Sequence, residues 1–502
     1  MKNVLEYLEK TASVKHDQQA VVMEGQSVSW AQLAEISQQI GTGLAKHVKP
    51  KTPVPVLAEK GIDTLCAFFG IVYAGCFYIM LNPQLPEARL KSILDTLESP
   101  CLLTDAQSAT LARSLSANVI EIEELKGEAN YGLLNKIRTA QTDSDPLYAL
   151  FTSGSTGVPK GVLVSHRNVI DFIDTFTGTF DIGEGDVIAN QAPFDFDVSV
   201  KDIYSSIKTG AKLVLVPKHL FSQPTELTVY LEKNGVTTLI WAVSALCLIS
   251  TFHCLDYCRP QLINKILFSG EVMPVKHLKE WISYYPDAVF VNLYGPTEIT
   301  CNCTYHIVNN NDGYENGIPI GRAFKNREVF LLDNENNLVT ESGKTGEICV
   351  RGVSVAMGYF NNPQQTALAF VQNPLNKKYT DIIYRTGDLG KYNEDGELVF
   401  SGRKDFQIKH MGHRIELEEI ERAMTAINEI SRACCVFDEK KSKLFGFYTG
   451  NLEKKELHGV LSKTLPVYMI PGALRQIEEF PLNKNGKIDR KLLFEIYGGR
   501  RR

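Results

Sequence analysis

Short apolar runs alternate with amphipathic segments along the chain from Met1 to about Tyr305. Val54–Ala58 has the length and composition of a buried strand, whereas Trp30–Leu44 places its apolar residues at helical spacing. Strands that alternate with helices predict an α/β domain with a largely parallel sheet. By the same criteria we expect strands at Ala20–Glu24, Val187–Ala192, Leu213–Val216, Thr238–Ala242, Lys265–Phe268 and Ala288–Asn292, and helices at Asn168–Phe176, Val200–Ile207 and Leu227–Lys233.

The pattern changes after Tyr305. Apolar runs separated by Gly, Asn and Asp turns predict strands at Arg327–Asp333, Gly346–Arg351 and Glu397–Phe400, and therefore a β-rich subdomain over about 306–402. We expect a boundary after residue 402, followed by a small, mobile α+β domain over 403–502. The predicted architecture is a large N-terminal domain of α/β sheets plus the β-rich subdomain, 1–402, and this C-terminal domain.

One apolar stretch has almost the length of a membrane span. Leu65–Leu81 contains no charged residue, but it is short for a span, and Gly70 and Gly75 interrupt it. We expect a buried helix that runs into a buried strand, and no membrane insertion.

Composition and charge exclude several classes of protein. The 502 residues carry a net charge of −5 and no evident basic face, so nucleic acid is not an expected partner. The N-terminus lacks the basic-then-apolar layout of a signal peptide. The eleven cysteines are scattered without the spacing of a disulfide framework or a zinc site, which favours reduced thiols in a cytoplasmic protein.

A loop rich in Thr, Ser and Gly follows the apolar, β-prone run Tyr148–Phe151 and ends at Gly161. Small residues let backbone N–H groups approach an anion, and Lys160 adds a positive charge, so the loop favours phosphate binding. It differs from the ordinary P-loop, because two residues separate Gly157 from Lys160. The alternative interpretation is a flexible connector.

Further motifs follow this loop in order. They are Asn-Leu-Tyr-Gly-Pro-Thr-Glu at 292–298, Tyr-Arg-Thr-Gly-Asp at 384–388, Ser-Gly-Arg-Lys-Asp-Phe-Gln-Ile-Lys at 401–409 and Asn-Gly-Lys-Ile-Asp-Arg at 485–490. Together with the loop, they resemble those of the acyl-adenylate-forming superfamily. Within it, Asn-Gln-Ala-Pro-Phe at 190–194 and Phe-Asp at 196–197 resemble amino-acid adenylation enzymes, both stand-alone D-alanine–carrier protein ligases and adenylation domains of nonribosomal peptide synthetases.

The resemblance implies an AMP-forming ligase that uses ATP and Mg²⁺. A carboxylate is a poor electrophile, so it is first joined to AMP as a mixed anhydride with release of pyrophosphate, and a thiol then attacks the anhydride. The implied substrates are an amino acid and the phosphopantetheine thiol of a carrier protein supplied in trans. Because the first step brings an anion against a polyphosphate, catalysis depends on positioning and charge neutralisation.

The resemblance also assigns roles to single residues. Glu298 would bind Mg²⁺, as a hard carboxylate oxygen can, Asp388 would hold the ribose hydroxyls, with Arg403 as a second ribose contact, and Tyr294 would pack on adenine. The implied ATP-binding set is Thr152, Ser153, Gly154, Ser155, Thr156, Gly157, Lys160, Asn292, Tyr294, Gly295, Thr297, Asp388, Arg403 and Lys487, of which Thr152, Lys160 and Lys487 would be catalytic together with Glu298.

The C-terminal domain would supply the remaining parts. Lys487 would be a mobile lysine that contacts the α-phosphate and the substrate carboxylate, although Asn-Gly-Lys by itself predicts an exposed type I′ turn. Asp405 would be the hinge about which the domain swings between the two half-reactions.

Asp197 indicates an amino acid substrate, since by resemblance it pairs with the substrate ammonium. The pocket would be lined by Asp197, Val198, Lys201, Leu267, Ser269, Leu293, Cys301 and Asn302. Lys201 and Ser269 depart from the D-alanine ligases, which carry an apolar residue and a cysteine there. Lys201 either forms an i,i+4 ion pair with Asp197 or directs its ammonium into the pocket, toward an acidic or polar substrate side chain.

Two other functions are open to this sequence. An acyl- or aryl-CoA ligase would share the fold, but Asp197 argues against a substrate without an amino group. A non-catalytic nucleotide-binding relative is the second alternative, and Lys160, Glu298, Asp388 and Lys487 argue against it.

Overall fold

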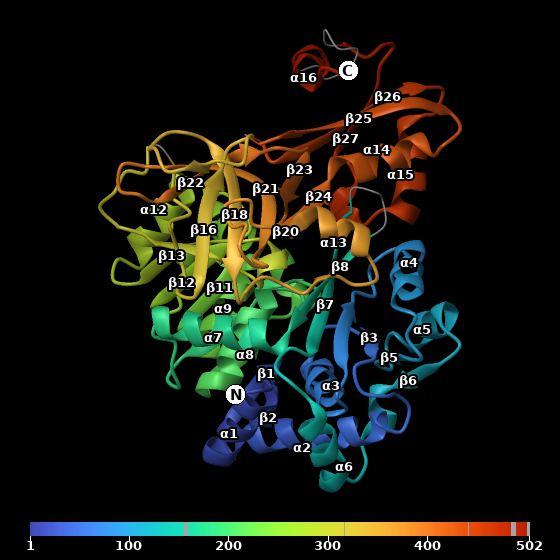
Figure 1. The fold of residues 1–502 in the computed structure, drawn as a ribbon, viewed down its shortest axis with the longest axis vertical. Coiled ribbons are helices and arrows are strands. Elements are labelled where there is room, and N and C mark those ends of the chain that lie inside the picture. The colour runs from blue at the N-terminus through green and yellow to red at the C-terminus, as the bar shows by residue number, and fades with distance from the viewer. Residues whose placement is uncertain (155–158, 316, 440, 483–487, 499–502) are drawn as a thin grey trace. The chain divides into compact units, whose positions relative to one another are not determined.

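The computed structural model describes residues 1–154, 159–315, 317–439, 441–482 and 488–498, which divide between two compact units. The first unit contains residues 1–83, 97–150 and 161–404, and the second contains 84–96, 151–160 and the segment that begins at Asp405. Figure 1 shows the elements of both units.

A nine-stranded sheet of the first unit has the order β15-β14-β13-β12-β11-β9-β10-β1-β2. The strands from β13 to β1 in this order run parallel to their neighbours, and the outer strands are antiparallel. The strands are β1 (Gln19–Met23), β2 (Gln26–Ser29), β9 (Val187–Asn190), β10 (Lys212–Leu215), β11 (Thr238–Ala242), β12 (Lys265–Ser269), β13 (Val289–Tyr294), β14 (Thr304–Ile307) and β15 (Arg322–Ala323).

A seven-stranded sheet has the order β19-β8-β7-β4-β3-β5-β6. Its strands are β3 (Pro53–Leu57), β4 (Phe77–Leu81), β5 (Leu102–Thr104), β6 (Val119–Glu121), β7 (Pro146–Thr152), β8 (Lys160–Ser165) and β19 (Gly358–Tyr359). The helices are α1 (Leu5–Lys15), α2 (Trp30–Leu44), α3 (Ile62–Tyr73), α5 (Ala109–Leu115), α6 (Tyr131–Ala140), α7 (His166–Thr179), α8 (Val198–Thr209), α9 (Pro224–Lys233), α10 (Val243–Thr251), α11 (Cys254–Tyr257), α12 (Val275–Tyr284) and α13 (Pro363–Ala369), with 3₁₀ turns η1 (Ile122–Leu125), η2 (Lys218–Ser222) and η3 (Thr297–Ile299).

Side chains on both faces of the nine-stranded sheet are buried. Ile188 and Ile240 pack in one core with α3, α7 and α8, whereas the neighbouring Ala189 and Trp241 pack in a second core with α9, α10 and α12. Burial on both faces explains why these strands read as continuous apolar runs, as parallel strands do.

A six-stranded sheet forms the β-rich part of the first unit, with the order β17-β16-β18-β21-β20 and β22 paired to β21. Every pairing in it is antiparallel. The strands are β16 (Arg327–Leu332), β17 (Leu338–Val339), β18 (Gly346–Gly352), β20 (Phe370–Gln372), β21 (Ile382–Tyr392) and β22 (Leu398–Arg403).

The second unit has its own core. Ile415, Ile420 and Met424 pack with Leu444 and Leu457. Its elements are the helix α4 (Glu87–Leu97, whose last residue lies in the first unit), the hairpin β23 (Gln407–His410) and β24 (His413–Glu416), the sheet β25 (Ile430–Asp438), β26 (Lys443–Gly450) and β27 (Ala473–Gln476), and the helices α14 (Leu417–Thr425), α15 (Lys454–Thr464), η4 (Val467–Met469) and α16 (Arg490–Tyr497).

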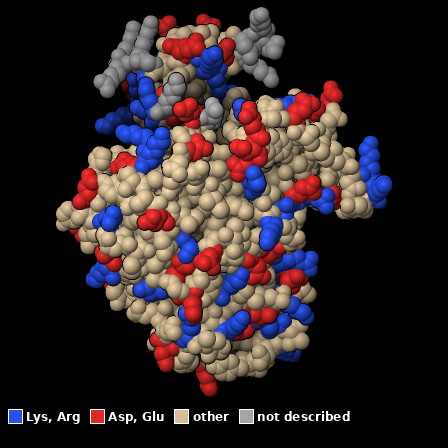
Figure 2. Space-filling view, turned by 90° about the vertical axis from the view of Figure 1, so that its left-hand side faces the viewer, with Lys and Arg blue, Asp and Glu red and all other residues tan. Residues whose placement is uncertain are grey.

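The α/β class and many predicted elements are confirmed. The helix α2 and the strand β11 have the predicted bounds, and the apolar stretch at 65–81 is the end of α3 followed by the fully buried β4. Within the described ranges, the structure contains no helix with both the length and the apolarity that crossing a bilayer requires. On the face in Figure 2, acidic and basic side chains are interspersed over the lower part.

Candidate active site

The strands β12 and β13 bring candidate residues to one edge of the nine-stranded sheet. Ser269 ends β12, Tyr294 ends β13, and the register places Ser269 beside Leu293. The carboxyl ends of adjacent parallel strands are where open α/β sheets bind ligands. Asn292, also on β13, donates from Nδ2 to the Pro319 carbonyl at 2.8 Å.

The chain turns sharply after β13, and Gly295 makes the turn possible. A Cβ at Gly295 would lie 2.6 Å from the Asn302 Cα and 2.7 Å from the Cys301 carbonyl oxygen. Thr300 and Cys301 have φ values of 57° and 70°, which β-branched and larger side chains rarely adopt. The turn thus packs the predicted pocket residues Cys301 and Asn302 directly against the β13 end.

Asp197 lies immediately before α8, where the helix dipole favours a carboxylate. The Cys301 thiol donates to the Asp197 carbonyl oxygen at 3.3 Å, so the two segments meet. Burial, followed by the nearby Asp197 charge, holds the pKa of Cys301 well above its usual range. The predicted apolar lining residues are buried as well: Val198, Leu267 and Leu293.

The Lys201 side chain is 1% exposed and extends from α8 toward the strand ends. Its Nζ donates to Ser269 Oγ at 3.1 Å and to Asn302 Oδ1 at 3.0 Å. The structure therefore joins three residues that the sequence placed in one pocket.

Asp388 and its neighbours form a second cluster, from β21, β22 and the end of β13. Tyr294 donates from its hydroxyl to Asp388 Oδ2 at 2.5 Å, and the Arg403 guanidinium donates to Asp388 Oδ1. Burial and the Asp388 charge keep the pKa of Tyr294 far above its ordinary value. The β21–β22 register sets Asp388 opposite Arg403, so this predicted pair is assembled by backbone pairing.

Glu347 on β18 fixes the strand that carries Asp388. Arg385 Nε donates to Glu347 Oε2 at 2.8 Å, Lys404 Nζ donates to the same oxygen at 3.1 Å, and Gly387 N donates to Oε1 at 3.2 Å. Burial opposes ionisation here, but the hydrogen bonds from Arg385 and Lys404 lower the pKa of Glu347 below its usual value.

Glu298 is 1% exposed in the turn η3, beside the predicted Thr297. Tyr359 donates from its hydroxyl to Glu298 Oε1 at 2.8 Å. The carboxylate therefore accepts a hydrogen bond that fixes one oxygen, and a carboxylate oxygen is the ligand type that Mg²⁺ prefers. Glu298 therefore fits the role of one carboxylate ligand to Mg²⁺, although among the described residues no group of three or more His, Cys, Asp or Glu side chains could hold a metal ion.

The other predicted residues belong to the second unit. Thr152 ends β7, Ser153 donates from Oγ to the Arg414 carbonyl at 2.7 Å, and Gly154 is buried. Lys160 begins β8, and exposed Asp405 begins the last segment of the unit. Ser155, Thr156, Gly157 and Lys487 lie outside the described residues.

A buried polar group beneath α8 was missed by the sequence analysis. Lys60 donates from Nζ to the carbonyls of Asn190 (3.3 Å) and Gln191 (3.2 Å), and Asn190 Nδ2 donates to Asp202 Oδ2 at 2.8 Å. Burial lowers the pKa of Lys60 and raises that of Asp202. The sequence contains one indication of this group, which is the lysine two residues beyond the predicted strand at 54–58.

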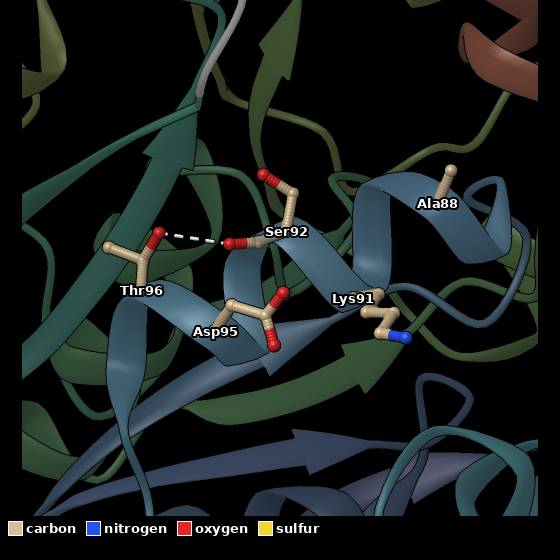
Figure 3. Close-up of a pocket in the computed structure, with 5 residues that line it drawn as sticks. All are labelled: Ala88, Lys91, Ser92, Asp95 and Thr96. Carbon is tan, nitrogen blue, oxygen red and sulfur yellow. Dashed lines mark hydrogen bonds between the residues drawn. The ribbon is translucent and has the colours of Figure 1, made fainter.

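A hollow on the second unit is lined by residues other than the predicted ones. Figure 3 shows that all its labelled lining residues belong to α4: Ala88, Lys91, Ser92, Asp95 and Thr96. The hydrogen bond drawn there, from Thr96 Oγ1 to the Ser92 carbonyl, is internal to the helix. None of the predicted site residues lines this hollow.

Comparison with known proteins gives concordant results. The family model described as AMP-binding enzyme matches residues 8–360. Zwittermicin A synthase ZmaJ of Bacillus cereus is 34% identical over 497 residues, covering 95% of this chain and 92% of that protein. The D-alanine–D-alanyl carrier protein ligase of Lacticaseibacillus casei (strain BL23) is 32% identical over 510 residues, covering 98% of both. Longer curated relatives also match, and the chain spans 8% of one and 38% of another.

Solved structures share the fold. The Vibrio cholerae adenylation domain AlmE, determined in complex with glycyl-adenosine-5'-phosphate, superimposes with a TM-score of 0.86 at 22% identity, covering 99% of this chain and 98% of that one. The fold class and the superfamily inferred from the motifs are thereby confirmed. The chain belongs to the AMP-binding enzyme family, as an AMP-forming ligase with the fold of an adenylation domain.

Proposed function

We propose that the chain activates an amino acid as aminoacyl-AMP with ATP and passes the aminoacyl group to the phosphopantetheine thiol of a carrier protein supplied in trans. Relatives of both kinds, the carrier protein ligase and the synthase, support amino acid activation and transfer to a carrier protein. The observation that carries the proposal is the cluster at the start of α8, where Asp197 adjoins Cys301 and Lys201 contacts Ser269 and Asn302.

Asp197 would pair with the substrate ammonium. Its place at the N-terminus of α8 favours the ionised carboxylate, and a carboxylate–ammonium hydrogen bond is about twice as strong as a neutral one. The substrate carboxylate would then be presented to the α-phosphate of ATP, and its oxygen would displace pyrophosphate. An acid that lacks the amino group would lose this contact and leave Asp197 without its ligand.

Asp388 would hold the ribose of ATP. Hydrogen bonds from Tyr294 and Arg403 orient its carboxylate, which can accept further hydrogen bonds from ribose hydroxyls. Glu298 would hold Mg²⁺, with Tyr359 hydrogen-bonded to one of its oxygens. When bound, Mg²⁺ would neutralise the negative charge that develops on the departing pyrophosphate.

Lys201 would set the substrate class. The acceptors Ser269 Oγ and Asn302 Oδ1 are neutral, so an incoming carboxylate or amide oxygen would make a stronger, charge-assisted contact with the ammonium than either of them does. This arrangement supports the interpretation of Lys201 as a pocket residue. We therefore favour an amino acid with an acidic or polar side chain over alanine.

A pyrophosphate-exchange panel over L-, D- and β-amino acids tests the proposal directly. Exchange with one acidic or polar amino acid, and none with its des-amino analogue, is expected. Exchange with the des-amino acids would favour the acyl- or aryl-CoA ligase alternative, and no exchange with any carboxylic acid would favour the non-catalytic one. Lys201→Met should shift the profile toward apolar side chains, and an unchanged profile would refute the role of Lys201.

The C-terminal region would complete the site. We propose Lys487 as the lysine of the adenylation step, with Thr152 and Lys160 on the phosphates and Asp405 as the hinge. The start of the last segment of the second unit at Asp405 supports the hinge, and the proposed domains are 1–402 and 403–502. The eleven cysteines are reduced thiols outside any disulfide, which suits a cytoplasmic location, and that location stays a prediction.

A further inference from the structure

The short strand β19 is attached to the strand that follows the predicted phosphate loop. Gly358 pairs with Leu163 and Tyr359 with Val162 of β8. On either side of β19, Met357 N donates to the Leu163 carbonyl at 2.9 Å and Phe360 N to the Gly161 carbonyl at 2.7 Å. These consecutive backbone hydrogen bonds fix β19 at the edge of the seven-stranded sheet.

The same segment holds Glu298 by two contacts. Ala356 N donates to the Glu298 carbonyl at 2.9 Å, and the Tyr359 hydroxyl donates to Glu298 Oε1 at 2.8 Å. Tyr359 and Glu298 are 7% and 1% exposed, so water competes little for this hydrogen bond.

The Tyr359 ring itself has little freedom. Its plane meets the Phe370 ring edge-on at a centroid distance of 5.5 Å, and its backbone N donates to Thr366 Oγ1 at 2.9 Å. The backbone hydrogen bond and the ring contact thus hold the side chain whose hydroxyl donates to Glu298 Oε1.

We propose that Tyr359 is a positioning residue for the divalent cation of ATP. Its hydroxyl fixes the rotamer of the Glu298 carboxylate, and its backbone connects Glu298 to β8, which begins at Lys160 of the phosphate loop. The inference rests on the proposed metal role of Glu298. Groups that hydrogen-bond a metal-ligating side chain typically contribute about 10- to 100-fold to metal affinity.

Mn²⁺ is the probe for the test, because the free ion is measured by electron paramagnetic resonance without any turnover. The full chain, with ATP, is titrated with Mn²⁺ for the parent, Tyr359→Phe, Glu298→Gln and Tyr7→Phe. Tyr7 is the matched control: its hydroxyl donates to Asp174 Oδ1 at 2.7 Å, so Tyr7→Phe also removes one tyrosine–carboxylate hydrogen bond.

Tyr359→Phe, once cooperative urea unfolding shows that it is folded, should raise the dissociation constant of Mn²⁺ about 10-fold or more, whereas Tyr7→Phe should leave Mn²⁺ binding unchanged. Binding by Tyr359→Phe within twofold of the parent would overturn the inference, provided that Glu298→Gln weakens it. If Glu298→Gln also binds Mn²⁺ like the parent, the metal role of Glu298 itself is wrong.

A second variant covers the case in which Tyr359→Phe does not fold. Tyr359→4-aminophenylalanine keeps the ring and an N–H donor at the reach of the hydroxyl, and it should bind Mn²⁺ more tightly than Tyr359→4-fluorophenylalanine, which has a similar size and no donor. Equal Mn²⁺ binding by these two variants would contradict the role of the hydrogen bond and leave Tyr359 with a packing role alone.

Discussion

At the scale of single residues, hydrogen bonds hold a carboxylate in one predicted half of the site and an ammonium in the other. Asp388 lies between Tyr294 and the Arg403 guanidinium, whereas Lys201 lies between Ser269 and Asn302. A buried carboxylate suits hydroxyl donors such as ribose, and a buried ammonium suits an oxygen acceptor. We therefore expect the ribose of the nucleotide to contact a carboxylate and the side chain of the amino acid to contact an ammonium.

Asp388→Asn should weaken ATP binding. The substitution removes the charge that receives the Arg403 hydrogen bond, and hydrogen bonds to charged groups contribute about 1.5–3 kcal/mol, so we expect the KM for ATP in pyrophosphate exchange to rise about 10-fold or more. Asp174→Asn removes a carboxylate that contacts Tyr7 and Lys208 instead, and it should leave this KM unchanged. An unaltered KM in Asp388→Asn would refute the ribose assignment.

At the scale of elements, helix capping and strand pairing extend some elements beyond their predicted bounds. The helix predicted at 168–176 runs from His166 to Thr179 and so starts two residues earlier, because Ser165 is its N-cap and forms a capping box with Asn168. The strand predicted at 288–292 continues to Tyr294, and β21 passes through Thr386-Gly387-Asp388, which in isolation is typical of a turn. Pairing with β18 and β22 overrides the local preference there.

Gly295→Ala should disturb the pocket turn. The added Cβ would lie 2.6 Å from the Asn302 Cα, and because that is a backbone atom the turn must shift, at a cost of about 1–3 kcal/mol. Urea unfolding should show this loss, and the KM for the amino acid should rise more than the KM for ATP. Gly178→Ala in α7 meets no atom within 4 Å and should be neutral or slightly stabilising. A Gly295→Ala enzyme as stable as the parent would contradict the close approach.

His166 at the start of α7 should make stability depend on pH. Its Nδ1 accepts a hydrogen bond from Val4 N at 3.3 Å, and burial lowers its pKa from about 6.5 to about 3. Below pH 6.5 the unfolded chain binds a proton here that the folded chain does not, so the free energy of unfolding falls as the pH falls.

His166→Asn keeps an acceptor for Val4 N but cannot titrate. The drop in unfolding free energy between pH 7 and pH 5 should therefore be about 2 kcal/mol smaller than in the parent, as measured by urea unfolding. The exposed His16→Asn is the control. The same drop in His166→Asn and in the parent would show that His166 does not titrate as described.

At the scale of the whole molecule, the two half-reactions are proposed to use both units. The nucleotide and pocket clusters lie in the first unit, whereas Thr152, Lys160 and Asp405 belong to the second. Because the proposed reactive groups are divided between two units, rotation about a few residues can replace one set of reactive groups by another between the two half-reactions.

Lys487→Ala should separate the two steps. Amino-acid-dependent pyrophosphate exchange should fall about 100-fold or more, because a positive charge is lost where negative charge develops, while thiolation from supplied aminoacyl-AMP should be largely spared. Lys491→Ala, at an exposed position of α16, is the control and should retain exchange. Normal exchange in Lys487→Ala would refute the assignment.

The sequence by itself determined the α/β class, the order of the motifs and hence the family, because strand periodicity and motif order are local properties of the chain. The direction of the Lys201 ammonium and the hydrogen bond from Tyr359 to Glu298 were decided by the tertiary structure alone. Lys201 meets an asparagine 101 positions away, and Tyr359 a glutamate 61 positions away. Such contacts depend on which strands become neighbours and in which register, and no local pattern encodes that.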